Sequence, residues 1–378
     1  MARPVVLVLG GYGVFGRRIA ANLARHGDID VVVAGRNAVS AGKTVRVVGA
    51  DRARFLVVNM SRPDAIAQVI AQKPAIVVDA LGPFQARNLA LPRKCAERGI
   101  HYVDISDARA RVAEIVSLDS IARLENAAII SGASTVPAFT TAIVDELAPN
   151  PREVVEIDVG ISPGHLAARG VATVSAILSY CGQAIARIGG NLPAYGWGDL
   201  VRHEYPAPVG RRWLSNVDTP ERALWRKRYP ALQTANVRAG LEISVLHLLL
   251  SALSRGVRIG VLPPLTRGAK LSLKIARLFD WLGTDTGAMH VEVLTRDANA
   301  RSDLHAAVLI AEQGDGPQVP AAPPSAVVKK LLGLPGYKRL DRRGAFPCVG
   351  ILTRAEIMNE LAGFAIRYES ETRPAQDM

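Results

Sequence analysis

Short apolar runs alternate with helical segments through the first 150 residues of the chain. The runs are rich in Val, Ile and Leu, as is typical of parallel strands that are buried on both faces. They cover residues 5–9, 31–34, 55–58, 76–78, 100–105 and 127–130. Because strands and helices alternate in chain order, the pattern predicts a parallel sheet with helices on both faces.

A glycine-rich loop follows the first apolar run and leads directly into a helical segment. The loop consists of Gly11, Tyr12, Gly13, Val14, Phe15 and Gly16, with glycines at the G-x-G-x-x-G spacing. Between a strand and a helix this spacing favours dinucleotide binding, because bare backbone can approach a pyrophosphate at the positive end of the helix dipole. A glycine turn without a ligand is the alternative. The pattern therefore predicts a Rossmann-type domain.

The second apolar run is followed by Gly35, Arg36 and Asn37, at the place where such domains bind the adenosine ribose. No carboxylate is present there to accept hydrogen bonds from the ribose hydroxyls of NAD. The guanidinium of Arg36 is suited to a 2′-phosphate, which it would hold through paired donors. We therefore predict NADP, with NAD as the alternative cofactor. The structural alternative for Arg36 is a solvated surface residue that contacts no ligand.

Two more groups of residues are expected at the carboxyl ends of the strands, where ligands of parallel sheets bind. Leu81, Gly82 and Pro83 follow the fourth run and would border the nicotinamide. His101 and Asp107 lie on or just after the next run and are the candidate catalytic proton donors. The structural alternatives are a satisfied core or edge histidine and a helix-capping aspartate.

After residue 150 the pattern changes to apolar and polar residues in strict alternation over 155–161, which predicts a strand with one solvated face. The other elements expected here are strands at 289–295, 304–311 and 364–368, a helix at 172–188, a linker at 314–324 and a capping box at Thr353 and Glu356. The second half thus predicts an α+β domain with a mixed or antiparallel sheet.

Several motifs resemble those of the saccharopine dehydrogenase-type oxidoreductases. The matching segments are GGYGVFG at 10–16, AGRN at 34–37, DALGPF at 79–84, HYVDIS at 101–106, GASTVP at 132–137 and GAFPCVG at 344–350. The resemblance is strongest over residues 1–150. It implies hydride transfer between NAD(P) and a small imine, amine or carbonyl substrate.

The resemblance also implies an organisation for the whole chain of 378 residues. We expect a Rossmann dinucleotide-binding domain at 1–150, a substrate-binding and dimerisation α+β domain at 151–318, and a carboxy-terminal segment at 319–378 that packs back on the first domain. A homodimer is expected through the family. Arg211 and Arg212 are candidate contacts for a substrate carboxylate.

Composition narrows the partners. The net charge is +12, but the basic residues are scattered and form no long run or nucleic-acid-binding motif, so we expect no nucleic-acid partner. The three cysteines are far apart and lack metal-ligand or dithiol spacing, so reduced thiols and no metal are expected. The amino terminus lacks the pattern of a signal peptide, and we expect a cytoplasmic protein.

Basic and apolar residues interleave between Arg255 and Trp281. A helix of this kind is able to rest on an anionic bilayer, but a solvated surface helix is the interpretation we favour. Two functions therefore stand beside the oxidoreductase: a non-catalytic dinucleotide-binding sensor or scaffold, and a membrane-peripheral reductase of a lipid-like substrate.

Overall fold

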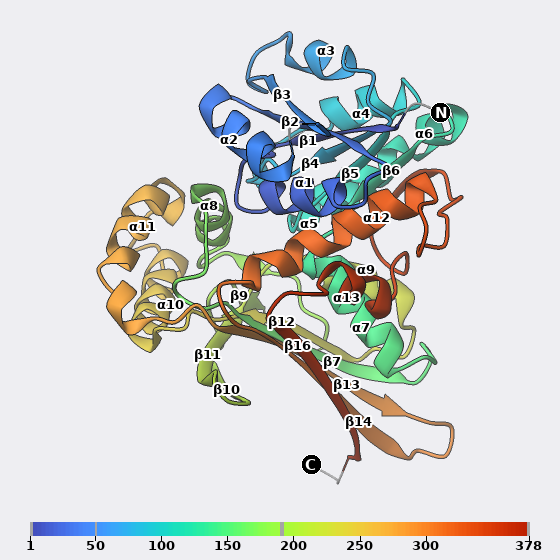
Figure 1. Ribbon diagram of the computed structural model, residues 1–378. Coiled ribbons are helices and arrows are strands. Elements are labelled where there is room, and N and C mark those ends of the chain that lie inside the picture. The colour runs from blue at the N-terminus through green and yellow to red at the C-terminus, as the bar shows by residue number, and fades with distance from the viewer. Residues whose placement is uncertain (1–2, 50, 190–192, 376–378) are drawn as a thin grey trace. The chain divides into compact units, whose positions relative to one another are not determined.

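The computed structural model describes residues 3–49, 51–189 and 193–375, and the chain forms two compact units (Figure 1). Unit 1 comprises Met1–Phe139 and Gln318–Leu361, and unit 2 comprises Thr140–Pro317 and Ala362–Met378. The first boundary thus lies before the predicted residue 150. The expected carboxy-terminal segment at 319–378 is divided between the two units, because its last strand pairs within the sheet of unit 2.

Unit 1 contains a seven-stranded parallel sheet in the order β15-β6-β5-β4-β1-β2-β3. Its strands are β1 Val5–Leu9, β2 Asp30–Gly35, β3 Ala53–Val57, β4 Ile76–Asp79, β5 His101–Asp104, β6 Ala128–Ser131 and β15 Gly344–Pro347. Its helices are α1 Gly16–Ala24, α2 Ala38–Val48, α3 Ala65–Ile70, α4 Ala90–Ala96, α5 Arg109–Glu114, α6 Asp119–Leu124, α12 Ala322–Leu332 and α13 Arg354–Glu360. The strand order reverses between β1 and β4, which is where ligands bind in open α/β sheets.

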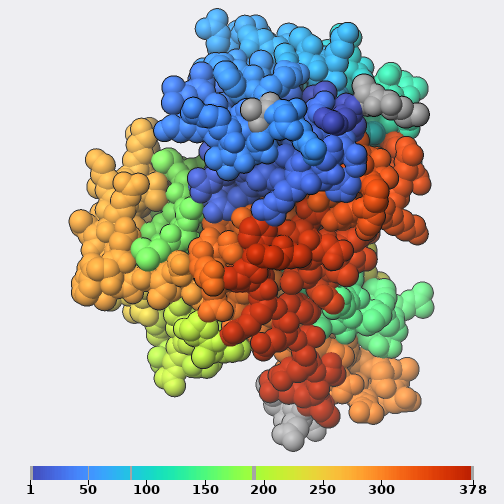
Figure 2. Space-filling view, in the orientation of Figure 1, coloured from blue at the N-terminus to red at the C-terminus, as the bar shows by residue number. Residues whose placement is uncertain are grey.

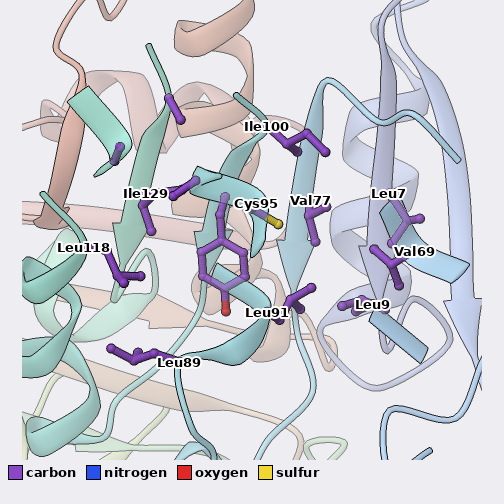
Figure 3. Packing of buried hydrophobic residues seen from close by; sticks show 14 of the residues in the cluster. Leu7, Leu9, Val69, Val77, Leu89, Leu91, Cys95, Ile100, Leu118 and Ile129 are labelled. Atoms are coloured by element: carbon purple, nitrogen blue, oxygen red, sulfur yellow. The ribbon is translucent and has the colours of Figure 1, made fainter. Parts of the chain in front are cut away.

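The central strands are buried on both faces, which explains their continuous apolar sequences. On one face Leu7, Val77 and Ile129 pack against Val69, Cys95 and other side chains of the covering helices (Figure 3). Burying a side chain of this size contributes about 1.5–3 kcal/mol, so the core stabilises the sheet edge that carries the functional loops. The expected parallel α/β domain is confirmed.

The predicted linker at 314–324 is instead the approach to α12, a helix that packs against α1. Pro323 and Pro324 suggested a loop, but they occupy the first turn of this helix, where backbone amides have no intrahelical partner. The Thr353 side chain and Glu356 form the predicted capping box of α13.

Unit 2 contains a seven-stranded mixed sheet in the order β10-β11-β12-β7-β13-β14-β16. Its strands are β7 Val154–Ser162, β10 Val201–Tyr205, β11 Gly210–Asn216, β12 Thr234–Ala239, β13 Gly287–Arg296, β14 Ser302–Ala311 and β16 Ile366–Pro374, with β8 Ala184–Ile185 and β9 Ala194–Tyr195 in a separate pair. Its helices are α7 Thr140–Leu147, α8 Val171–Ser179, α9 Glu221–Arg228, α10 Ser244–Arg258 and α11 Ala269–Arg277. The predicted mixed or antiparallel sheet is confirmed.

The helix expected at 172–188 is shorter than predicted and ends at Ser179. Gly182 follows with a φ of +70°, and a Cβ there would lie 2.5 Å from the carbonyl oxygen of Ser254. This close approach to α10 requires a glycine in a turn rather than a continuing helix. No helix of the described residues is long and apolar enough to cross a membrane.

Candidate functional site

The glycine-rich loop lies at the carboxyl end of β1 and is closed by its own backbone. The amides of Gly10 and Gly11 donate to the carbonyl of Ala34 at 2.8 and 3.2 Å, and the amide of Gly13 donates to Gly10 at 2.7 Å. A Cβ on Gly16 would lie 2.2 Å from the carbonyl oxygen of Gly10, so only glycine lets α1 pack this closely on the loop. The loop therefore places the start of α1 at the end of the strand.

Two features of this loop suit an anionic ligand. A Cβ on Gly13 would have a single heavy atom within 4 Å, the carbonyl oxygen of Gly10 at 3.0 Å. The outer side of the loop is therefore open to the approach of a ligand. The first turn of α1 contains Arg17 and no acidic residue. Positive side chains are unfavourable at a helix amino terminus unless an anion neutralises them. These residues fit the pyrophosphate of a dinucleotide.

Tyr12 joins the glycine loop to the end of β2. A Cβ on Gly35 would be 2.4 Å from the Tyr12 ring, and the Tyr12 hydroxyl accepts a hydrogen bond from the Asn37 amide at 3.1 Å. The Asn37 side chain accepts from the Ser40 amide at 2.9 Å and caps α2, so it serves the fold. Arg36 is exposed beside them. The predicted residues of the adenosine end thus lie together.

The loop after β4 is held by a buried carboxylate. Asp79 is fully buried and accepts a hydrogen bond from the Leu81 amide at 3.0 Å. Arg87 donates to both carboxylate oxygens of Asp79 and to the Leu81 carbonyl, each at 2.9 Å. Burial lowers the pKa of Arg87, but the Asp79 carboxylate outweighs it and the net shift is upward. This clamp fixes the loop of Leu81, Gly82 and Pro83 beside Gly10.

The clamp continues into the neighbouring strand. The Tyr102 hydroxyl lies 3.1 Å from Asp79 and 3.3 Å from Asp104, and it accepts a hydrogen bond from Arg111 at 3.1 Å. Burial raises the pKa of both Tyr102 and Asp104, and the guanidinium of Arg111 opposes the shift of Asp104. Two carboxylates, one phenol and two guanidinium groups therefore share one buried network.

Asp104 also fixes the loop after β6. Its carboxylate accepts hydrogen bonds from the Ser131 hydroxyl at 2.7 Å and from the Gly132 amide at 2.9 Å. The Asp104 carbonyl accepts from the Ala133 amide at 2.8 Å. One side chain thus ties the carboxyl ends of β5 and β6 together.

Asp107 lies just past the carboxyl end of β5, at the same edge of the parallel sheet as the glycine loop after β1. Its carboxylate accepts a hydrogen bond of 3.5 Å from Gln85, which belongs to the turn after β4. Loss of water raises the pKa of Asp107. The cap of α5 is Ala108, without a side-chain cap hydrogen bond, so Asp107 does not cap that helix.

His101 is at the opposite end of β5. It is paired with Ile76, the first residue of β4, and its Nδ1 accepts a hydrogen bond from the Ala128 amide at 3.0 Å. Burial, with positive charge from Arg343 and Arg339, lowers its pKa to about 4. The prediction of His101 as a proton donor loses its geometric basis, since the ligand edge is at the other end of the strand.

The predicted carboxylate contacts in unit 2 are already paired within the chain. Arg212 forms an ion pair of 3.1 Å with Glu242, and both side chains are largely buried. Arg211 forms an exposed ion pair of 2.6 Å with Glu204. The described residues include no group of three or more His, Cys, Asp or Glu side chains placed to hold a metal ion.

Sequence reasoning missed the residues of the buried network. Asp79 and Asp104 each end an apolar strand, and this shared position was the available signal. Arg87 and Arg111 gave none, because an arginine after a strand usually faces solvent and only the fold brings these two to the carboxylates.

Comparison with known proteins identifies the first domain. Residues 6–130 match the family model of the saccharopine dehydrogenase NADP binding domain. No curated protein matches the chain.

Several solved structures align with the chain. Apo histidine-tagged saccharopine dehydrogenase (L-Glu forming) from Saccharomyces cerevisiae aligns with 97% of this chain and 100% of its own, at 12% identity and a TM-score of 0.67. A dehydrogenase from Chromobacterium violaceum aligns with 83% of this chain and 76% of its own, at 11% identity and a TM-score of 0.38. GenD2 from gentamicin A biosynthesis, in complex with NAD, aligns with 78% of this chain and 70% of its own, at 14% identity and a TM-score of 0.38.

The yeast enzyme therefore shares its fold over nearly the whole length of the chain. Residues 6–130, which contain the glycine loop, thus match the saccharopine dehydrogenase NADP binding domain.

Proposed function

We propose that this protein is an NADPH-dependent oxidoreductase that acts on a small imine, amine or carbonyl substrate. The observation that supports this most is the open, glycine-lined loop at the start of α1, which lies within the segment that matches the NADP-binding family model. Arg36 is exposed at the end of β2, where an acidic residue would favour NAD.

When bound, the cofactor supplies or accepts a hydride at the substrate carbon. Residues of the chain bind the cofactor and transfer the proton. The glycine loop and α1 hold the pyrophosphate, Arg36 holds the 2′-phosphate, and the clamped loop at Leu81 borders the reacting ring. Asp107, just past the carboxyl end of β5, delivers the proton to the substrate oxygen or nitrogen when the substrate is reduced and accepts it when the substrate is oxidised. Burial raises the pKa of its carboxyl group.

Turnover tests the enzymatic part of the proposal. The protein is incubated with NADPH and a panel of keto acids, keto acid and amine pairs, and hydrophobic carbonyls, and loss of the reduced cofactor is followed by absorbance. We expect consumption with at least one member. NADPH binding without consumption across the panel would instead favour the sensor or scaffold.

Arg36→Ala tests the cofactor preference. The parent should bind NADPH more tightly than NADH, and the variant should lose about tenfold or more of that preference, because a charge-assisted contact to the phosphate is removed. Arg46→Ala is the matched control, since Arg46 is an exposed arginine of α2. An unchanged preference in Arg36→Ala would show that this residue does not bind the 2′-phosphate.

A further inference from the structure

Exposed apolar side chains are concentrated on one part of unit 2. More than half of the large hydrophobic residues that are exposed in the described part of the chain lie between residues 245 and 282. We call this set the α10–α11 surface: Val245, Leu248, Leu249, Ile259, Val261, Leu271, Ile275, Leu278, Trp281 and Leu282. The segment is the gold region of Figure 2. Scattered exposed hydrophobics are ordinary, but a cluster of this kind marks an interaction site.

Helix α10 leaves several of its apolar residues exposed. Leu246, His247, Ser251 and Ser254 are buried, while Val245, Leu248 and Leu249 are exposed. The buried His247 is hydrogen-bonded on both ring nitrogens, at 3.0 Å to the Ser215 hydroxyl and at 3.2 Å to the Leu241 amide. A helix that covers a soluble domain normally buries its apolar residues and exposes its polar ones. The hydrogen bonds of His247 and Ser254 hold α10 to the unit, and Val245, Leu248 and Leu249 remain exposed.

Helix α11 is exposed along most of its length, and only Ala269 is buried. Leu271 and Leu278 are 61% and 72% exposed and lie on one stripe with Ile275. Lys270, Lys274 and Arg277 form a parallel exposed stripe at the same spacing. The helix is followed by Trp281, which is 80% exposed. Apolar and basic stripes side by side, next to an aromatic residue, are typical of helices that lie at a membrane interface.

Charge discriminates between the partners that would cover this surface. The segment from 244 to 282 contains six basic residues, Arg255, Arg258, Arg267, Lys270, Lys274 and Arg277, and one acidic residue, Asp280. A second copy packed through the same surface would bring these like charges together, which is unfavourable. An anionic phospholipid surface would neutralise them while the leucines and Trp281 enter the headgroup region.

We propose that the α10–α11 surface binds peripherally to an anionic phospholipid bilayer. Both α10 and α11 lie in unit 2, so this binding does not depend on the dinucleotide site. It accounts for the exposed leucines and for the basic stripe with one partner. Contact at the interface needs no membrane-spanning helix.

Vesicle sedimentation of the full-length protein tests the proposal. Vesicles of phosphatidylcholine alone are compared with vesicles that also contain phosphatidylglycerol, at low and high salt. We expect sedimentation with the anionic vesicles at low salt and a marked loss at high salt, since exposed charges are screened. The variant Lys270→Gln/Lys274→Gln/Arg277→Gln should lose about tenfold or more in partitioning.

The apolar contribution is tested by Leu271→Gln/Leu278→Gln/Trp281→Gln, which should also bind about tenfold more weakly. Its matched control is Val116→Gln/Leu124→Gln, two exposed apolar residues of unit 1. Circular dichroism and thermal melting verify that each variant is folded. Light scattering reports the oligomeric state.

Absence of sedimentation with either vesicle overturns the proposal, as does equal binding by the parent and both triple variants. A parent dimer that the apolar triple variant converts to a monomer, without vesicle binding, would identify the surface as a contact between copies. NADPH binding by the same preparations is measured separately and reports on the proposed function.

Discussion

At the scale of single residues, burial sets the charge of His101. Its ring is desolvated, lies near Arg343 and Arg339, and accepts a hydrogen bond from the Ala128 amide, so the neutral form is favoured and its pKa falls to about 4. The unfolded chain, with the usual pKa of 6.5, binds a proton more readily between these two values. The contribution of His101 to the free energy of unfolding is therefore fully present above pH 6.5 and is lost as the pH falls towards 4.

His101→Asn removes this titration, because the amide oxygen of asparagine is able to accept the same hydrogen bond. Between pH 7 and pH 5 the parent should lose about 1–2 kcal/mol more stability than the variant, as measured by urea unfolding. Turnover of the variant should remain that of the parent, since His101 lies at the end of β5 away from the glycine loop. A variant that folds normally but has no activity would restore His101 as a catalytic candidate.

At the scale of elements, the loops after β4, β5 and β6 are held by one charged network. Arg87 is the part of it that reaches the Leu81 carbonyl, and its side chain is 23% exposed whereas that of Asp79 is fully buried. Removing the arginine leaves a buried carboxylate without its ion-pair partner, which is costly in a protein interior.

Arg87→Met should lower the free energy of unfolding by about 3 kcal/mol and weaken NADPH binding, because the loop at Leu81 loses its clamp. The free energy of unfolding and the NADPH affinity of Arg87→Lys should lie between those of Arg87→Met and the parent, since one nitrogen of Arg87 makes all three contacts. The matched control is Arg211→Met, which breaks an exposed ion pair and should cost less than about 1 kcal/mol. Equal losses in Arg87→Met and Arg211→Met would show that the network does not hold the loop.

The elements differ in how well they could be predicted from the sequence. β1, β2 and β4 were evident because strands buried on both faces carry continuous apolar residues. Helix α4 begins only at Ala90, because residues 84–87 first form a turn that places Arg87 on Asp79. That turn depends on a buried partner, which local periodicity does not report.

At the scale of the whole molecule, the pairings that complete each sheet come from distant parts of the chain. β15 and β16 are consecutive strands in the sequence. Nevertheless β15 pairs with β6 in unit 1, whereas β16 pairs with β14 in unit 2. β16 contains Glu369, Glu371 and Arg367 and is largely exposed, as suits an edge strand, so its sequence carries little apolar signal. The division of the last 60 or so residues between two units could not be predicted from such a segment.

Only those parts of the candidate site that form local sequence motifs could be predicted. The glycine loop and Arg36 follow from spacing along the chain, and the structure brings them together at the ends of β1 and β2. The buried network needed the fold, since Asp79 and Tyr102 belong to different strands.

Titration of NADPH into the parent, Gly13→Ala and Gly42→Ala, followed by cofactor fluorescence, tests whether the glycine loop binds the pyrophosphate. A Cβ at position 13 would meet only the Gly10 carbonyl oxygen, and one at position 42 would meet nothing within 4 Å, so both variants should fold. We expect saturable binding by the parent and Gly42→Ala, and affinity weaker by about tenfold or more in Gly13→Ala, where the methyl group blocks the pyrophosphate. Unchanged affinity in Gly13→Ala, or no binding by the parent, would show that the loop does not bind the cofactor.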